Sequence, residues 1–380
     1  MSTTASTSFQ LPDLLSLTRE FDLRANKRCH TALEESEEWL TGLHDTAGTR
    51  VFTQGEIERI HGQKMGLLAA LGLPTCDTPQ LRLVADFLGL LVIANERVKR
   101  GNGDATDWAE IGGFIDEVDF VGLLESHSLL KCLQPRISRL RRTTPSHWQR
   151  RFKSSILTLR DAQLRVKKYR DTIPELDEYL EFARDLSGLR VVFNLLESAE
   201  GLDFNLSGKD AEDLNRLRRL AAEFIAISFD VFSFNNDQAA GCQLNLVQLL
   251  ISQQGLSIQG AVNLAGTMAS ERIQAFTTLE AELWARHSPP SESPAEPSTW
   301  FSTIMGYFYP APPALSPSIV EEWDTGTSND VSLFIQGLKD CMVGSLNWAF
   351  ESEMFFGQKG AAIRSFGWVF LLPPEGSATP

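Results

Sequence analysis

The stretch from Ile227 to Gln253, ISFDVFSFNNDQAAGCQLNLVQLLISQ, carries the pattern around which the rest of the chain can be arranged. Asp230 is followed by Ser233 and then by Asp237, and residues three, four and seven positions apart share one face of an α-helix. Two carboxylates and a hydroxyl on one face can hold a hard cation such as Mg²⁺ through oxygen atoms. The same spacing is equally typical of an amphipathic helix whose acidic side chains are solvated.

The composition limits the classes of partner and compartment. The 380 residues carry a formal net charge of −14, which disfavours nucleic acids and anionic membrane surfaces as partners. Five cysteines without a C-x-x-C pair are typical of reduced thiols in a cytoplasmic protein. The N-terminus has no signal-peptide pattern, and we find no apolar run long enough to span a membrane. We therefore expect a cytoplasmic monomer or homodimer that acts on a small molecule.

Helical periodicity recurs along the chain, whereas alternating, strand-like segments are scarce. The expected helices lie within Asn26–Leu43, Glu56–Leu73, Pro79–Arg100, His147–Arg170, Glu175–Glu200, Ser257–Ala285 and Ser332–Phe356. These segments predict a single all-α domain over residues 26–372. We expect a flexible N-terminal segment at 1–25, a proline-rich loop at 287–317 and a flexible tail at 373–380.

The helix expected over Glu175–Glu200 contains an arginine followed four residues later by a glycine, Arg184 and Gly188. A glycine inside a helix costs about 1 kcal/mol relative to alanine, so its presence indicates a break in the helix. The arginine guanidinium has a fork of donors that suits bidentate binding of a phosphate group. The alternative interpretation is an ordinary arginine–glutamate surface pair beside a tolerated glycine.

These motifs together resemble those of the fungal class I terpene cyclases. The run from Asp230 to Asp237 resembles the family's second metal motif, N-D-x-x-S-x-x-x-E, and is followed by the matching Gly241, Cys242, Asn245, Leu246 and Val247. Arg184 and Gly188 match a diphosphate-sensing arginine and a helix break, and Trp348 opens a W-x-x-E-S run near the C-terminus. The resemblance covers roughly residues 26 to 357. It implies an α-helical fold around a central apolar pocket, in which three Mg²⁺ ions remove diphosphate from a prenyl diphosphate.

The chain departs from the family pattern at several positions that would bind metal or diphosphate. The family's first acidic motif falls on residues 94–98, ANERV, where Glu96 is the only carboxylate and Lys99 follows with a positive charge. The asparagine of the second motif is Phe229, and its glutamate is the shorter Asp237. The C-terminal R-Y pair is Met354 and Phe355. The resemblance thus leaves Asp230, Ser233 and Asp237 as a weak candidate set for Mg²⁺.

The candidate site residues fall into two groups. The expected catalytic residues are Asp230, Ser233, Asp237, Arg184 and Glu96. The expected substrate-binding residues are Asn95, Gly188, Phe87, Phe232, Phe234, Trp348 and Phe355, of which the aromatic ones can stabilise a passing carbocation.

Three hypotheses for the function follow from the resemblance and its departures. The first is a terpene-cyclase-like enzyme of fungal secondary metabolism that acts on an already activated terpenoid without the three-Mg²⁺ cluster. Its reaction would be a stereoselective cyclisation, or C–N or C–O bond formation in which a nucleophile such as an amine co-substrate captures an allylic cation. The second is an ordinary Mg²⁺-dependent sesquiterpene synthase acting on farnesyl diphosphate with degenerate motifs. The third is a non-catalytic terpenoid-binding protein.

Overall fold

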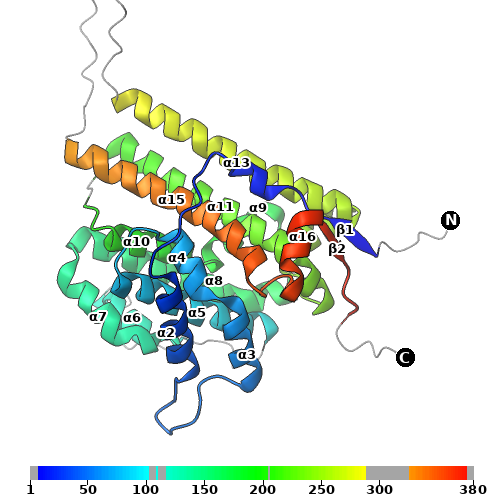
Figure 1. Ribbon diagram of the computed structural model, residues 1–380, viewed down its shortest axis with the longest axis horizontal. Coiled ribbons are helices and arrows are strands. Elements are labelled where there is room, and N and C mark those ends of the chain that lie inside the picture. Colours follow the sequence, from blue (N-terminus) through cyan, green and yellow to red (C-terminus); the bar gives the residue numbers. More distant parts are fainter. Residues whose placement is uncertain (1–6, 102–107, 110–116, 204–205, 288–324, 375–380) are drawn as a thin grey trace, which may run out of the picture.

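Helix α5, Thr78–Arg100, has a long buried stretch and lies among other helices in the body of the fold (Figure 1). Pro79 lies in its first turn, where the missing N–H is not needed, and Gly101 ends it with a φ of 70°. The residues from Leu83 to Leu91 are all buried, and α5 packs against α2, α4, α8 and α10. The apolar run in this segment thus corresponds to a helix surrounded by other helices.

The computed structural model describes residues 7–101, 108–109, 117–203, 206–287 and 325–374. The longer helices are α2 Cys29–Thr41, α3 Gln54–Gln63, α4 Met65–Gly72, α7 Gln134–Thr143, α8 Ser146–Asp171, α9 Leu176–Leu186, α10 Leu189–Ala199, α11 Gly208–Ala239, α12 Leu246–Gln254, α13 Ile258–His287 and α15 Thr325–Glu351. The short elements are α1 Leu14–Leu17, α6 Phe120–Glu125, η2 Leu130–Leu133, η3 Gly357–Lys359, α16 Gly360–Phe366, β1 Ser8–Gln10 and β2 Trp368–Phe370. Within the described residues the only sheet is the antiparallel pair of β1 and β2, so the all-α prediction is confirmed.

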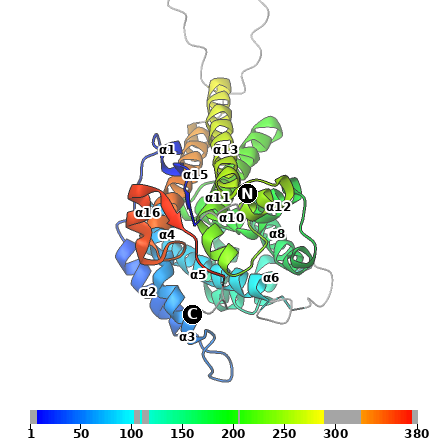
Figure 2. The ribbon, with the colours of Figure 1, turned by 90° about the vertical axis from the view of Figure 1, so that its right-hand side faces the viewer.

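The long helices α11, α13 and α15 lie side by side across the body formed by the earlier helices (Figures 1 and 2). Helix α11 packs against both α13 and α15 and also against α9. The second half of α11, which carries the Asp230 motif, is therefore enclosed by helices that come before and after it in the chain. None of the described helices combines the length and apolarity needed to cross a bilayer.

Part of the segment 1–25, for which we expect flexibility, forms the strand β1 at Ser8–Gln10 and the short helix α1 at Leu14–Leu17. Phe9 in β1 is 1% exposed and packs against the ring of Phe234, with ring centroids 5.5 Å apart. The side-chain amide of Gln259 on α13 makes two hydrogen bonds with the backbone of Gln10: its oxygen accepts from the N–H at 2.8 Å, and its nitrogen donates to the carbonyl at 2.9 Å. These long-range contacts order a segment that has little helical periodicity of its own. The expected proline-rich loop, from residue 288 on, and the tail, from residue 375 on, lie outside the described residues.

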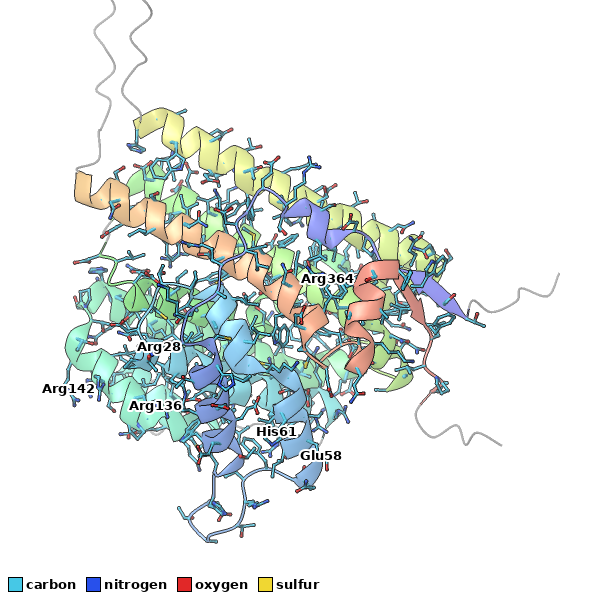
Figure 3. All side chains as sticks on the ribbon, viewed as in Figure 1. Arg28, Glu58, His61, Arg136, Arg142 and Arg364 are labelled. Carbon is cyan, nitrogen blue, oxygen red and sulfur yellow. The ribbon has the colours of Figure 1, made fainter. Side chains whose placement is uncertain are left out.

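A buried ion cluster joins α2, α5 and α7. Asp86 on α5 is fully buried, accepts a 2.6 Å hydrogen bond from the Ser36 hydroxyl on α2, and pairs with Arg136 on α7. The guanidinium of Arg136, the residue labelled in Figure 3, lies 4.6 Å from the centre of the Trp39 ring, within the range of a cation–π interaction. Ser36 and Trp39 on α2 thus help to hold α2, α5 and α7 together.

Candidate functional site

Asp230, Ser233 and Asp237 lie on one face of α11 and form a polar cluster with Asn245, the N-cap of α12. The Ser233 hydroxyl donates to Asp237 Oδ2 at 2.6 Å, and the Asn245 amide donates to the same oxygen at 2.8 Å. Asn245 Nδ2 also lies 2.8 Å from the backbone carbonyl of Asp230. We call these four residues the carboxylate cluster. Asn245, which the sequence places in the tail of the motif, joins the end of α11 to the start of α12.

Asp230 is 9% exposed, and its carboxylate binds donors from outside α11. Its Oδ2 atom accepts hydrogen bonds from the Tyr179 hydroxyl at 2.7 Å and from the backbone N–H of Leu246 at 3.0 Å. Burial raises the pKa of Asp230 to about 6, although the nearby Lys99 ammonium and the Tyr179 hydroxyl act against this shift. A carboxyl group that titrates near neutral pH can take up or release a proton under working conditions.

Arg184 is held by carboxylates and does not extend freely toward a ligand. Its Nε lies 3.1 Å from Asp185 Oδ1, one of its terminal nitrogens lies 3.3 Å from Glu223 Oε1, and the other lies 3.5 Å from Glu181 Oε1. The residue is only 8% exposed. Arg184 stays a candidate anion-binding residue, but in this arrangement its donors serve the packing of α9 against α11.

Gly188 marks a break between two helices, as the sequence predicts. Helix α9 ends at Leu186 and α10 begins at Leu189, with Gly188 between them at a φ of 69°. A Cβ atom at this position would lie 2.4 Å from a methyl group of Leu91 on α5. Both the positive φ and the close approach therefore require glycine here.

The C-terminal end of α5 is tied to the helices around it. The Asn95 amide donates to the Leu186 carbonyl at 2.9 Å, and its oxygen accepts from Gln163 at 2.8 Å. Glu96 accepts from Arg59 at 3.1 Å and from Gln63 at 3.3 Å. Burial raises the pKa of Glu96, against the opposing effect of Arg59. Asn95 and Glu96 therefore bind side chains of α3 and α8 and a backbone carbonyl of α9, and among the described residues they make no hydrogen bond to the carboxylate cluster.

Aromatic rings fill the space where α11 meets the end of α15. The ring of Phe355 lies 5.3 Å from that of Phe229, 5.9 Å from that of Phe232 and 5.8 Å from that of Trp348. We call these four residues the aromatic cluster. Phe229 and Phe355, which replace polar residues of the family motifs, thus pack against each other.

Two expected pocket residues lie elsewhere in the structure. Phe234 contacts Phe9 of β1, because it projects from another side of α11 than Phe232 does. Phe87 is 1% exposed in the core of α5 and, among the described residues, has no ring contact with the aromatic cluster. Both side chains are buried, but periodicity alone does not indicate which partner each of them meets, and their role in substrate binding stays a prediction.

The residues present do not fit a cluster of three Mg²⁺ ions, which the resemblance implies. Of the positions that match the first acidic motif, Ala94 and Val98 offer no oxygen ligand, and Glu96 already accepts two hydrogen bonds. In the second motif, Asp237 Oδ2 accepts from Ser233 and from an amide, while Asp230 accepts from a different pair of donors. The described residues contain no group of three or more histidine, cysteine, aspartate or glutamate side chains arranged to hold a metal. Several Mg²⁺ ions would need more free oxygen ligands than this set supplies.

Three residues of this site have contacts that the sequence reasoning did not foresee. Asn245 belongs to the motif tail that carries the resemblance, and Tyr179 lies on α9 together with Arg184, but their hydrogen bonds to Asp237 and Asp230 span 8 and 51 residues of chain. Lys99 follows the first motif and acts on the same carboxylates through its charge. The sequence does show one sign of this effect: basic residues gather at the end of α5, next to the position of the family's first acidic motif.

Comparisons with known proteins point to one family. A family model described as "Terpene synthase family 2, C-terminal metal binding" matches residues 112–275. Sesquiterpene synthase 1 of Postia placenta is 27% identical over 379 residues, which cover 98% of this chain and 97% of that protein. Sesquiterpene synthase Agr1 of Cyclocybe aegerita is 28% identical, covering 96% and 93%. The alpha-muurolene synthase of Coprinopsis cinerea is 25% identical, covering 96% and 78%.

Solved structures show the same fold. A structure of hedycaryol synthase without ligand superposes with a TM-score of 0.64 at 19% identity and covers 90% of this chain and 99% of its own. An a-eudesmol synthase superposes with a TM-score of 0.62 at 16% identity, covering 87% and 97%. At such identities the likeness establishes the fold alone. Together with the matches along nearly the whole sequence, it shows that this chain is a relative of the fungal class I terpene cyclases and has their all-α fold.

Proposed function

We propose that this chain is a sesquiterpene cyclase, which converts a farnesyl-type C15 substrate into a cyclic sesquiterpenoid. The observation that carries the proposal is the similarity to sesquiterpene synthases over almost the full length of both chains. The aromatic cluster supports it, because ring faces stabilise carbocations that form in a water-poor interior. These relatives favour the ordinary use of farnesyl diphosphate over the unusual reaction that we placed first from the sequence.

The experiment is a product assay on the purified full-length protein. Farnesyl diphosphate and Mg²⁺ are supplied, hydrocarbons are identified by gas chromatography with mass spectrometry, and released pyrophosphate is measured in parallel. A cyclic C15 product formed together with pyrophosphate is the expected result. Pyrophosphate at the uncatalysed rate, with farnesol as the only organic product, would refute the proposal for this substrate.

The geometry of the polar residues favours a second candidate function. The carboxylates and Arg184 bind one another and their neighbours, and the donor set does not fit three Mg²⁺ ions. An enzyme of this kind would receive a terpenoid whose allylic carbon already carries a leaving group that departs without a metal ion. The lone pair of an amine nitrogen would form the new C–N bond as the bond to that group breaks and its electron pair leaves with it, and the ammonium proton would pass to a carboxylate such as Asp230.

This second candidate is distinguished by its response to chelation. Its product should form at the same rate with EDTA as with Mg²⁺, and it should contain nitrogen when an isotopically labelled amine is supplied. The variant Asp230→Asn should slow product formation, because a proton acceptor is lost. If neither assay yields a product while farnesol still binds saturably, the third hypothesis, a non-catalytic terpenoid-binding protein, explains the fold better.

A further inference from the structure

Exposed apolar side chains gather on α16 and β2, which lie next to β1 at one side of the molecule (Figure 1). Of the seven large apolar side chains that are exposed among the described residues, four lie within residues 366–372. Phe366 is 74% exposed, Trp368 50% and Phe370 72%. Trp368 and Phe370 alternate with the buried Val369, so both project from the same face of the strand pair. We call Phe366, Trp368, Phe370 and Leu372 the exposed apolar patch.

The backbone that carries this patch is held in place by side-chain amides. The Asn235 amide of α11 donates to the Phe370 carbonyl and accepts from the Leu372 N–H, both at 2.9 Å. On the other strand, the Gln259 amide holds the N–H and the carbonyl of Gln10. These amides occupy backbone groups at both outer edges of the strand pair, which hinders the addition of a further strand. A partner therefore meets the apolar face of a fixed surface and not a free strand edge.

The charges on this part of the chain differ from those of the whole. The protein carries a net charge of −14, yet residues 354–374 contain no aspartate or glutamate and include Lys359 and Arg364. Both basic residues are exposed. Arg364, labelled in Figure 3, projects from α16 and pairs with Glu351 at the end of α15. This segment thus lacks the excess of acidic charge that would repel it from phosphate groups.

We propose that the exposed apolar patch binds the surface of a phospholipid bilayer, with the rings of Trp368 and Phe370 inserted among the lipid headgroups. Aromatic side chains are enriched at this boundary, and large exposed apolar patches mark interaction sites. Little conformational entropy is lost on binding, because the backbone is already fixed. The net charge of the whole chain opposes anionic lipids, so the bilayer is zwitterionic. A second copy of the chain is a poorer partner, because it brings the same net charge of −14.

Cosedimentation with phosphatidylcholine vesicles that contain no terpenoid tests this proposal. The full-length wild type is compared with a double variant, Trp368→Thr with Phe370→Thr, in which threonine keeps the preference for a strand. Losing two inserted rings should lower the partition constant at least about tenfold. The control Leu333→Gln removes an exposed apolar side chain from α15, about 25 Å along that helix from Phe350, against which α16 packs. It should bind vesicles within about twofold of the wild type, because the patch is intact.

Fluorescence quenching keeps the test decisive if the double variant unfolds. Vesicles of brominated phosphatidylcholine should quench part of the tryptophan fluorescence of the wild type. Trp368→Phe keeps an apolar ring at the position, so it should still sediment with vesicles but lose that quenching. Equal quenching of the two proteins, or a wild type that does not sediment with vesicles, would overturn the proposal. A wild-type dimer that the double variant abolishes, without vesicle binding, would assign the patch to a second copy and overturn it as well.

Discussion

The buried Asp230 carboxyl should make the stability of the protein depend on pH in a direction opposite to that of most carboxylates. Burial raises its pKa from 3.8 to about 6 in the folded chain, whereas the unfolded chain keeps the ordinary value. Between these two pH values the folded state binds more protons than the unfolded state, so the free energy of unfolding falls as pH rises. The difference corresponds to about 3 kcal/mol, which is lost between about pH 4 and pH 6 and stays lost at higher pH.

The variant Asp230→Asn isolates this contribution, because the amide does not titrate. It can still accept a hydrogen bond from Tyr179 or from the Leu246 N–H, which bind the wild-type carboxylate at 2.7 and 3.0 Å. Any cost of the new amide hydrogens is independent of pH. The stability of Asp230→Asn relative to the wild type should therefore increase by about 3 kcal/mol from pH 4 to pH 7.

The assay is urea unfolding followed by circular dichroism at several pH values in that range. The control Asp171→Asn replaces an exposed carboxylate on α8 and corrects for the change in net charge. A difference between Asp230→Asn and the wild type that does not change with pH would refute the reasoning. A difference that favours the wild type more strongly at pH 7 than at pH 4 would refute it as well.

Three further variants, the first with a control variant, test local features by their free energies of unfolding in urea. Gly188→Ala should cost about 2–4 kcal/mol of stability, because the residue has a positive φ and its new methyl group would clash with a leucine on α5. The control Gly255→Ala also has a positive φ but has open space around it, so it should cost only about 1 kcal/mol. Equal costs for the two variants would contradict the clash. Although burial opposes it, the guanidinium of Arg97 lowers the pKa of Glu56 from 4.5 to about 2. Glu56→Gln should therefore cost up to about 3 kcal/mol at pH 7, a cost that fades as pH falls from 4.5 toward 2 and whose persistence at low pH would exclude this cause. Arg184→Ala should cost about 3 kcal/mol or more, because it leaves buried carboxylates without their partner, and an unchanged free energy of unfolding would show that these ion pairs are not formed in solution.

The helices were predictable because their signal is local. The apolar run of α5, the glycine break at Gly188 and the basic helix α8 each appear as a pattern within one segment, and the structure has them close to the expected limits. The order of the N-terminal segment was not predictable in this way. Its strand pairs with β2, which lies some 360 residues later in the chain, and its side-chain contacts are made with α11 and α13.

The candidate site was predictable only in part, for the same physical reason. Spacing places Asp230, Ser233 and Asp237 on one helical face, and the contact between Ser233 and Asp237 follows directly from it. Spacing does not indicate that the Asp230 carboxylate turns toward Tyr179, which is 51 residues away. Nor does it show that Arg184 is surrounded by three carboxylates, since one of them comes from another helix. Side-chain partners across helices are set by packing, and a single sequence carries no direct record of them.

The hydrogen bonds and ion pairs of the polar site residues limit which substrate the site can bind. Asn95, Glu96, Arg184, Asp230 and Asp237 all have partners within the chain. A diphosphate group carries several negative charges, so binding it here would require some of these contacts to break and new positive charge to be brought in. An apolar C15 chain makes no such demand, because it needs only aromatic and aliphatic walls. If farnesyl diphosphate is the substrate, we expect Arg184 to exchange the Glu223 carboxylate for the diphosphate. If the substrate arrives already activated, the same contacts can persist through the whole reaction.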